Sequence, residues 1–336
     1  MALQGSGSIS FGQIQNEFGL PSGKNLGAYR VSESYGELSN MPLDIGVPQS
    51  GSIKFSDFYG KQLNVVVNCY TGGTQNHLYA RTKWNNNSVN VVGGFRGKPA
   101  SSAGTRAIVH LNKTIRGNGV DGGSGFVCSF KTGPWESDTN LDVHIGTQGK
   151  VIGEGGKGGD GGSRNNGNKN GQRAASGFGV QYPIDLWNYG IIAGGGGGGA
   201  GGAGERRDRN SRSRDYRRCG WWCDSRGRRR NRDRRRQGGG GGGGGAGFPA
   251  GNPGAGPGSG SNGSSGSLFS GGSGGSGGPD GARSGTAGGN LGENGRSNDG
   301  KSGGSAGRAI VISGGSITYK VSGDIRGSTY NGAPYV

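Results

Sequence analysis

The residues best suited to chemistry in this chain lie in an arginine-rich block between Glu205 and Gln237. The block holds fifteen arginines against five acidic residues, so more than half of the chain's net charge of +17 is concentrated there. Planar guanidinium groups match the geometry of phosphate and carboxylate groups. The block therefore predicts contact with a polyanionic partner.

Two tryptophans and two cysteines lie at the centre of this block, in the sequence Cys219-Gly220-Trp221-Trp222-Cys223. A Cys219–Cys223 disulfide would place both indoles at the apex of an arginine-rich hairpin. Free thiols are the alternative, and a zinc site is less favoured because no second pair of ligands lies nearby. Exposed indoles usually mark a contact surface. The predicted contact residues are Arg217, Arg218, Trp221, Trp222, Arg226 and Arg228.

Two other interpretations of the block remain open. Most charge runs are simply solvated, and an arginine-rich arm can bind RNA. The chain has no Arg-Gly-Gly tripeptide and no aromatic strand motif of the RRM type. Nucleic acid is therefore a less favoured partner than an acidic or phosphorylated glycan, which would offer sugar rings to the indoles and anions to the guanidiniums.

The block interrupts a glycine tract that runs from about Gly153 to Gly307. Within it, triplets such as Gly155-Gly156-Lys157 and Gly271-Gly272-Ser273 repeat every three residues. Three is the period of the polyproline-II helix, which has no internal hydrogen bonds. Two bare glycine edges can pair with neighbouring helices of the same kind. We therefore predict a bundle of polyglycine-II helices over residues 151–307, with every third side chain outside and the insertion 205–237 displayed from it.

Disorder is the alternative for the glycine tract. With 84 glycines and 11 prolines in 336 residues, the composition is typical of flexible linkers. Two observations favour a folded tract instead. The triplets stay in register, and two apolar segments, Phe178–Trp187 and Ala309–Ile312, lie within or beside it.

The first 62 residues form a separate opening module. Its Ser-Gly-Ser-Ile-x-Phe sequence occurs twice, beginning at Ser6 and at Ser50. In the first copy Phe11, Ile14 and Phe18 share one face of a short helix, with Ser10 as its cap and Gly19 as its end. Elements this short make no stable core alone, so the module is expected to dock on something larger.

Residues 63–150 alternate apolar and polar side chains, as in Val65 and Val67 or Leu141, Val143 and Ile145. This period of two predicts a small β domain, sheet-like or sandwich-like. A glycine–aliphatic–glycine repeat around Val151, Ile192 and Ile325 predicts an apolar seam beside the glycine tract. Residues 308–336 are expected to be closing strands. The predicted fold class is therefore mostly β and irregular, with a short helical N-terminal module and a polyglycine-II bundle.

One segment of the opening module carries a family resemblance. Pro48-Gln49-Ser50-Gly51-Ser52-Ile53-Lys54-Phe55-Ser56-Asp57-Phe58-Tyr59-Gly60 resembles a motif common near the start of tail and tail-fibre proteins of tailed bacteriophages. Ile9–Gly19 is similar to the opening of the same proteins. The resemblance implies attachment to the virion through Ile9, Phe11, Ile14, Phe18, Ile53, Phe55, Phe58 and Tyr59.

The glycine tract is similar to that of the distal adhesins of T-even-type phages. In those proteins polyglycine-II helices carry variable loops at one end. This chain also has its own virion-type opening module, which leaves open whether it caps a fibre or forms a short tail appendage. Further loop candidates are Arg164–Arg173, Gly247–Leu268 and Leu291–Lys301.

Enzymatic motifs are absent from the sequence, which has no Gly-x-Ser-x-Gly, phosphate-binding loop or His-Glu-x-x-His. We expect no cofactor, no metal and no membrane insertion, and synthesis in a host cytoplasm without a signal peptide. The resemblance implies a virion adhesin of the tail fibre or tail tip. Its partners would be tail, baseplate or fibre proteins and a host cell-surface receptor, either a glycan such as lipopolysaccharide or an outer-surface protein. A homo-oligomer is possible. The alternatives are a structural or decoration protein and a nucleic-acid-binding protein.

Overall fold

The computed structural model describes residues 3–19, 25–30, 32–35, 38–42, 47–48, 50–69, 78–86, 89–91, 99–117, 128–163, 167–204, 238–279, 281–298 and 300–332. The chain divides into two compact units. The first, which we call the β unit, comprises Met1–Glu154, Ala175–Gly195 and Gly307–Val336. The second, the glycine unit, comprises Gly155–Ala174 and Gly196–Ala306.

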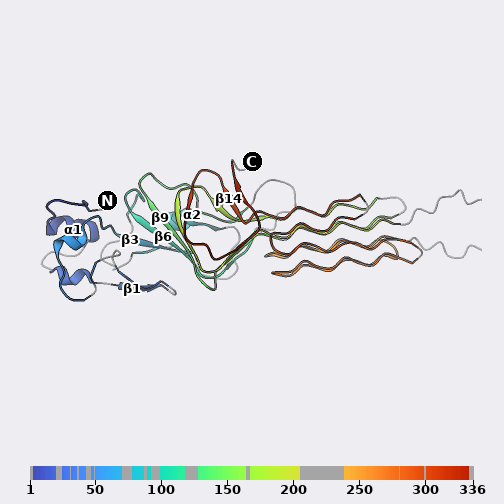
Figure 1. The fold of residues 1–336 in the computed structure, drawn as a ribbon, viewed down its shortest axis with the longest axis horizontal. Coiled ribbons are helices and arrows are strands. Elements are labelled where there is room, and N and C mark those ends of the chain that lie inside the picture. Colours follow the sequence, from blue (N-terminus) through green and yellow to red (C-terminus); the bar gives the residue numbers. More distant parts are fainter. Residues whose placement is uncertain are drawn as a thin grey trace, which may run out of the picture. The chain divides into compact units, whose positions relative to one another are not determined.

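Besides a two-stranded hairpin in the opening module, the β unit contains three sheets (Figure 1). In spatial order, the six-stranded sheet contains β15 (Ile317–Val321), β12 (Ile184–Asn188), β9 (Asn140–Ile145), β6 (Arg106–Leu111), β3 (Asn64–Asn68) and β5 (Val89–Val91). The five-stranded sheet contains β17 (Thr329–Asn331), β14 (Ile310–Ile312), β11 (Ser176–Val180), β8 (Cys128–Lys131) and β4 (Leu78–Tyr79). The four-stranded sheet contains β16 (Asp324–Arg326), β13 (Ile191–Ala193), β10 (Lys150–Ile152) and β7 (Thr114–Ile115).

From β6 to β17 the chain visits the six-, four- and five-stranded sheets in turn and then repeats the cycle. Neighbouring strands of these three sheets are parallel, except for the antiparallel pair β3 and β5. The β unit is therefore a parallel β-helix with three faces. The expectation of a mostly β fold is confirmed, but a sandwich-like topology is wrong, because each strand pairs with the equivalent strand of the next coil instead of with a hairpin partner.

Equivalent side chains of successive coils stack inside this helix. In the five-stranded sheet Phe130 and Phe178 are in register, and their rings stack with centroids 5.3 Å apart. In the four-stranded sheet Val151 pairs with Ile192, which pairs with Ile325. The predicted glycine–aliphatic–glycine seam is thus a ladder of three adjacent parallel strands. Burial of these ladders supplies the apolar core.

The glycine unit consists of two insertions in the β-helix, and both occur at the corner between the four-stranded and the five-stranded sheets. Residues 155–174 follow β10 and precede β11, and residues 196–306 follow β13 and precede β14. Both excursions therefore leave after a strand of the four-stranded sheet and return before a strand of the five-stranded sheet. Because β10 pairs with β13 and β11 pairs with β14, the two exits are neighbours and so are the two returns.

The opening module packs its aromatic residues edge to face against one another, in a cluster of Phe11, Phe18, Tyr29 and Phe58. Helix α1 (Phe11–Phe18) has a capping box between Ser10 and Gln13 and ends at Gly19, which has φ 76°. This matches the predicted helix. The short 3₁₀ helices η1 (Leu26–Tyr29) and η2 (Phe55–Phe58) follow, with the hairpin β1 (Ser32–Tyr35) and β2 (Leu38–Pro42) between them. The backbone amide of Leu63 donates to buried Glu17 (2.8 Å), tying α1 to the chain entering β3.

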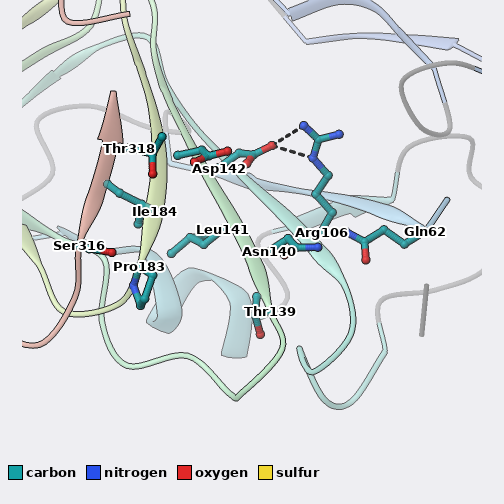
Figure 2. A pocket seen from close by; sticks show the side chains of 11 residues that line it. Gln62, Arg106, Thr139, Asn140, Leu141, Asp142, Pro183, Ile184, Ser316 and Thr318 are labelled. Carbon is teal, nitrogen blue, oxygen red and sulfur yellow. Dashed lines mark hydrogen bonds and ion pairs between the residues drawn. The ribbon is translucent and has the colours of Figure 1, made fainter. Parts of the chain in front are cut away.

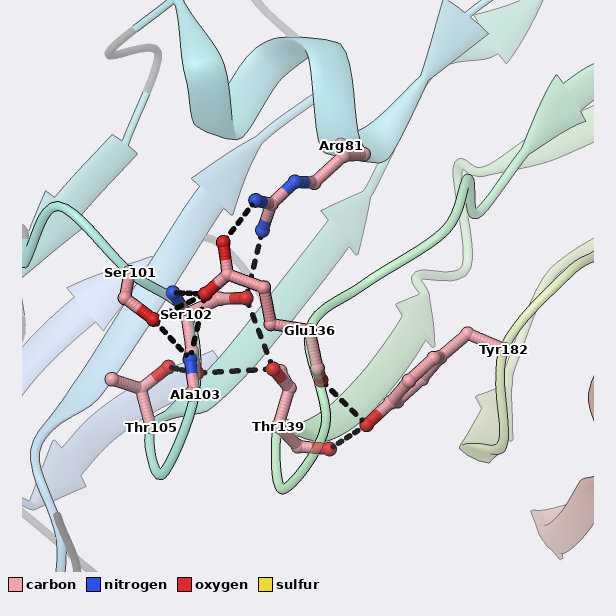
Figure 3. A network of polar contacts seen from close by, with 8 residues as sticks. All are labelled: Arg81, Ser101, Ser102, Ala103, Thr105, Glu136, Thr139 and Tyr182. Atoms are coloured by element: carbon pink, nitrogen blue, oxygen red, sulfur yellow. Dashed lines mark hydrogen bonds and ion pairs between the residues drawn. The ribbon is translucent and has the colours of Figure 1, made fainter.

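A polar network joins two corners of the β-helix beside helix α2 (Ala80–Asn85), as Figure 3 shows. Glu136 accepts hydrogen bonds from the Ser101 hydroxyl, from Arg81 and from the backbone amides of Ser102 and Ala103. These bonds, led by the one from Ser101, lower the pKa of Glu136 to about 2, against a smaller opposing effect of burial. Because both of its carboxylate oxygens accept hydrogen bonds, Glu136 has a structural role and holds the two corners together.

Glycine segments in the second unit pair at three-residue intervals. Gly156, Gly159 and Gly162 donate their amides to Gly196, Gly199 and Gly202, at 2.8–2.9 Å. These segments belong to no helix or strand class and run side by side in Figure 1. The exposed residues of the triplets recur with the same period, as at Ser273, Ser276 and Pro279, while every Gly of 238–247 is buried. The three-residue period of the sequence is thus also the period of the hydrogen bonds between segments.

Two segments made almost wholly of glycine lie inside this arrangement. Residues 238–247 exchange backbone hydrogen bonds with six neighbouring segments, at 156–162, 196–202, 251–254, 261–267, 272–278 and 283–289. Residues 196–203 likewise have six neighbours, at 156–162, 169–172, 240–246, 283–289, 293–296 and 304. A segment surrounded on all sides has room for no side chain larger than the buried methyl groups of Ala200 and Ala246, and at most of its positions for none. At Gly243, for example, an added Cβ would lie 2.0 Å from the carbonyl oxygen of Gly272.

Candidate functional site

The turns of the glycine unit fall at its two ends, and the arginine insertion is at one of them. Gly162 donates to Gly202 (2.8 Å), Gly278 to Gly238 (2.9 Å) and Arg283 to Ala203 (2.9 Å). These residues flank three connections, 164–166, 205–237 and 279–281, which must therefore start and finish at the same end. We call this the insertion end. The turns at 248–250 and 268–270 lie at the other end, where Gly247 donates to Ser267.

The two ends of the insertion are neighbours in the bundle. Gly202 donates to the carbonyl of Gly240 (2.8 Å), and Gly239 donates to that of Gly162 (2.8 Å). The insertion therefore leaves and re-enters through two adjacent buried segments. The predicted contact residues and the candidate disulfide, Arg217, Arg218, Cys219, Trp221, Trp222, Cys223, Arg226 and Arg228, lie outside the described residues.

An ion pair stiffens the bundle beside this end. The Lys169 ammonium contacts an Asp160 carboxylate oxygen at 2.9 Å, and the other oxygen accepts from the Ala255 amide at 3.1 Å. Burial alone would raise the pKa of Asp160, but the hydrogen bonds from Lys169 and Ala255 outweigh it and lower the pKa. Asn168 also donates to the Gly201 carbonyl (2.7 Å). Asn168 and Lys169 thus bind the scaffold itself.

The other predicted loops separate between the two ends. The segment Arg164–Arg173 includes the turn at the insertion end, whereas Gly247–Leu268 spans both ends. Leu291 is buried at the opposite end. Lys301 forms an isolated antiparallel bridge with Asn298. The sequence does not show which turns lie at which end of the glycine unit. That depends on the direction in which each segment runs, and the direction is fixed only by the hydrogen bonds between segments.

The residues predicted to dock on the virion gather in the core of their own module. Ile14, Phe18 and Phe58 are fully buried, and Phe18 and Phe58 pack edge to face with centroids 6.2 Å apart. Partly buried residues pack around them, namely Ile9, Phe11 and Ile53. The Tyr59 hydroxyl donates to the Gly7 carbonyl. Phe55 is 41% exposed, so it is the large apolar residue of this set that is open to a partner.

Neither a metal centre nor a membrane span is present in the described part of the chain. No group of three or more His, Cys, Asp or Glu side chains there could hold a metal ion. None of the described helices is long and apolar enough to cross a bilayer.

The buried thiols of Cys69 and Cys128 are not bonded to each other. Burial raises the pKa of each to about 12, which makes them unreactive.

Comparison with known proteins gives a family. No curated protein sequence matches the chain significantly. A solved structure, described as the gp37-gp38 adhesin tip complex of the bacteriophage S16 long tail fiber, is similar at 21% identity with a TM-score of 0.46. The match covers 84% of this chain and 89% of that one. The model of the phage tail fibre adhesin Gp38 family matches residues 80–330. The chain therefore belongs to the Gp38 family of phage tail fibre adhesins.

Proposed function

We propose that this adhesin binds a host cell-surface receptor through turns displayed at the insertion end of the glycine unit. The receptor is an acidic or phosphorylated glycan such as lipopolysaccharide, or an outer-surface protein. The role of the protein is binding and not catalysis. The observation that carries the proposal is the gathering of the connections at 164–166, 205–237 and 279–281 at one end of the unit.

We propose further that the glycine segments are polyglycine-II helices and act as a rigid scaffold. Hydrogen bonds at every third residue and six neighbours around each interior segment support this. A scaffold of this kind would hold both ends of the insertion in fixed positions. The ends of the insertion would then already be ordered in the free protein, which would reduce the entropic cost of binding the receptor.

For residues 1–62 we propose attachment to another tail or fibre protein of the virion. The resemblance of the opening motif to tail-fibre proteins supports this role. The exposed Phe55 ring and the partly buried Ile9 and Ile53 would supply the apolar contact. Ile14, Phe18 and Phe58 would act indirectly, by holding the module in shape.

Replacing residues 205–237 by a short Gly-Ser turn tests the receptor role. The expected result is a protein that melts as the parent does but no longer adsorbs to host cells. The matched control replaces the turn at 268–270, at the other end of the unit, and should leave adsorption unchanged. Normal adsorption after the first replacement would contradict the proposal.

A structural or decoration role is the alternative, and the purified protein distinguishes it. An adhesin should bind intact host cells without the rest of the virion, whereas a decoration protein should not. A nucleic-acid-binding protein would instead show an affinity for RNA or DNA that falls steeply with salt.

A further inference from the structure

A polar pocket lies on the outward face of the six-stranded sheet, in the β unit (Figure 2). Its volume is ≈ 390 Å³, within the range of about 300–1,000 Å³ that small-molecule sites occupy. Its walls come from the starts of β6, β9, β12 and β15 and the residues that precede them. Four successive coils of the β-helix therefore contribute to one concave site.

Four charged side chains form a row across the strands at this site. Arg106 of β6 contacts Asp142 of β9, and Lys320 of β15 contacts Asp185 of β12 at 3.2 Å. Asp142 and Asp185 are in register on adjacent parallel strands, where Cα atoms are about 4.8 Å apart. The two cations thus lie outside and the two carboxylates lie side by side between them. The row as a whole is electrically neutral.

Asp142 has an acceptor oxygen that the protein does not use. Its side chain is only 6% exposed, and Arg106 donates both contacts, at 2.6 and 2.7 Å, to the same oxygen, Oδ2. The other oxygen, Oδ1, accepts no hydrogen bond from any residue in the described ranges. The neighbouring Asp185 is 37% exposed at its side chain and presents a second carboxylate to the same space.

The chemistry of the lining defines what would fit. Two adjacent carboxylates exclude anions, and their flanking cations remove the need for a positively charged ligand. Among the described residues no third His, Cys, Asp or Glu side chain joins the two carboxylates, which disfavours a tightly held divalent cation. Adjacent hydroxyl groups can donate to both carboxylates. The side chains of Asn140, Thr139 and Thr318 add donors and acceptors, and Pro183 adds an apolar surface.

We propose that this pocket binds a neutral saccharide, with vicinal hydroxyls donating to Asp142 and Asp185. This site is separate from the receptor site proposed for the glycine unit. A site built to hydrogen-bond hydroxyl groups discriminates against ligands that lack them, because its acceptors would lose their water without gaining a donor. Each coil of the β-helix supplies one part of the site, so the fold holds these groups in place without a ligand.

Binding of methyl glycosides of glucose, galactose and mannose to the full-length protein tests the proposal. Saturation-transfer NMR should detect at least one of them, with a Kd on the order of 1 mM. Asp185→Asn and Asp142→Asn should each weaken binding about tenfold. The matched control, Asp324→Asn, changes an exposed carboxylate that pairs with Arg326 on β16 and should leave binding unchanged. Because Asp185 is partly exposed, its variant should fold even if the Asp142 variant does not.

Three results would overturn the proposal. The first is no transfer to any of the three glycosides at about 50 mM, far above a millimolar Kd. The second is transfer that both aspartate variants leave intact. The third is binding of CaCl₂ or methylamine in place of the sugars, lost in the same variants. Replacing residues 205–237 should not affect saccharide binding, so this site and the receptor site can fail independently.

Discussion

The two units of this adhesin solve the same problem in opposite ways. In both, each segment lies between parallel or antiparallel neighbours that satisfy its backbone hydrogen bonds. The β unit repeats every two residues and fills its interior with side chains such as Phe130 and Phe178. The glycine unit repeats every three residues and fills its interior almost entirely with backbone, the buried methyl groups of Ala200 and Ala246 being the largest side chains of its two surrounded segments. One unit is stabilised by apolar burial, and the other requires that nothing protrude.

The difference predicts opposite responses to substitution. Removing a side chain should damage the β unit, because it leaves a cavity. Adding one should damage the glycine unit, because the atoms it would strike belong to rigid backbone. Four substitutions test this contrast, in order of expected effect.

Gly243→Ala should have the largest effect. The new Cβ would lie 2.0 Å from the Gly272 carbonyl oxygen inside the bundle. Since no side chain can move aside, we expect a loss of more than about 4 kcal/mol in the free energy of unfolding. Thermal melting and limited proteolysis of the glycine unit would measure it. Gly167→Ala is the control, because no atom lies within 4 Å of its Cβ; if both variants melted alike, the packing argument would fail.

Phe178→Ala should be next. The ring is fully buried and stacks on Phe130. Its removal from a β-helix core should cost about 3–5 kcal/mol, measured by urea denaturation. The control is Tyr319→Ala, since that ring is 45% exposed. An effect of Phe178→Ala no larger than that of the control would mean that side-chain burial does not hold this unit together.

Acid should weaken the β unit through His144, which stacks on Trp187 with ring centroids 4.4 Å apart. Burial, then the nearby His110 and Arg106, lower its pKa from 6.5 to about 3. Between these two pH values His144 is protonated in the unfolded chain but neutral in the folded chain. The free energy of unfolding therefore falls as the pH drops from about 6.5 towards 3. By about pH 4.5 the loss should be at most about 2.5 kcal/mol.

His144→Phe should flatten this dependence while keeping the stacked ring. Urea denaturation at several pH values compares the two proteins. An unchanged slope between pH 6.5 and 4.5 would assign the acid sensitivity to other groups. The glycine unit has no histidine among its described residues, so we expect its melting to change less over the same range.

Ser10→Ala should have the smallest effect. The Ser10 hydroxyl caps α1 by accepting from the Gln13 backbone amide at 3.2 Å. In turn, the Gln13 side-chain oxygen accepts from the Ser10 backbone amide at 2.7 Å. Loss of such a cap costs about 1 kcal/mol. Exposed Ser8 provides the control variant Ser8→Ala. Equal melting temperatures for the two variants would show that tertiary packing, and not the cap, fixes this helix.

Local patterns in the sequence were sufficient for individual elements. Helix α1 was predicted from the spacing of Phe11, Ile14 and Phe18, with Ser10 and Gly19 as its limits. The period-two runs at Val65 and Leu141 are the strands β3 and β9. The outward position of every third residue in the glycine triplets also followed from the sequence. In each case the signal lies within about ten residues.

The winding of the β-helix could not be predicted in this way. Strands β12 and β15 are neighbours, yet the whole second insertion of the glycine unit separates them in the chain. The pocket shows the same limit, because Gln62, Arg106, Asp142 and Thr318 come from four distant segments. No sequence motif joins them. Of the predicted docking residues, Ile14, Phe18 and Phe58 form a core whereas Phe55 is exposed, and composition alone does not separate a core from an interface.

The three-residue spacing in the glycine unit also constrains how such an adhesin can diversify. One residue added within 271–278 would turn Ser273 or Ser276 inward against a neighbouring backbone, so a segment can lengthen only in whole triplets. A connection such as 205–237 has no such constraint, since Gly202 and Gly240 stay paired whatever lies between them. We therefore expect relatives built on the same scaffold to differ freely in the length and composition of this connection, while their glycine segments change only by whole triplets.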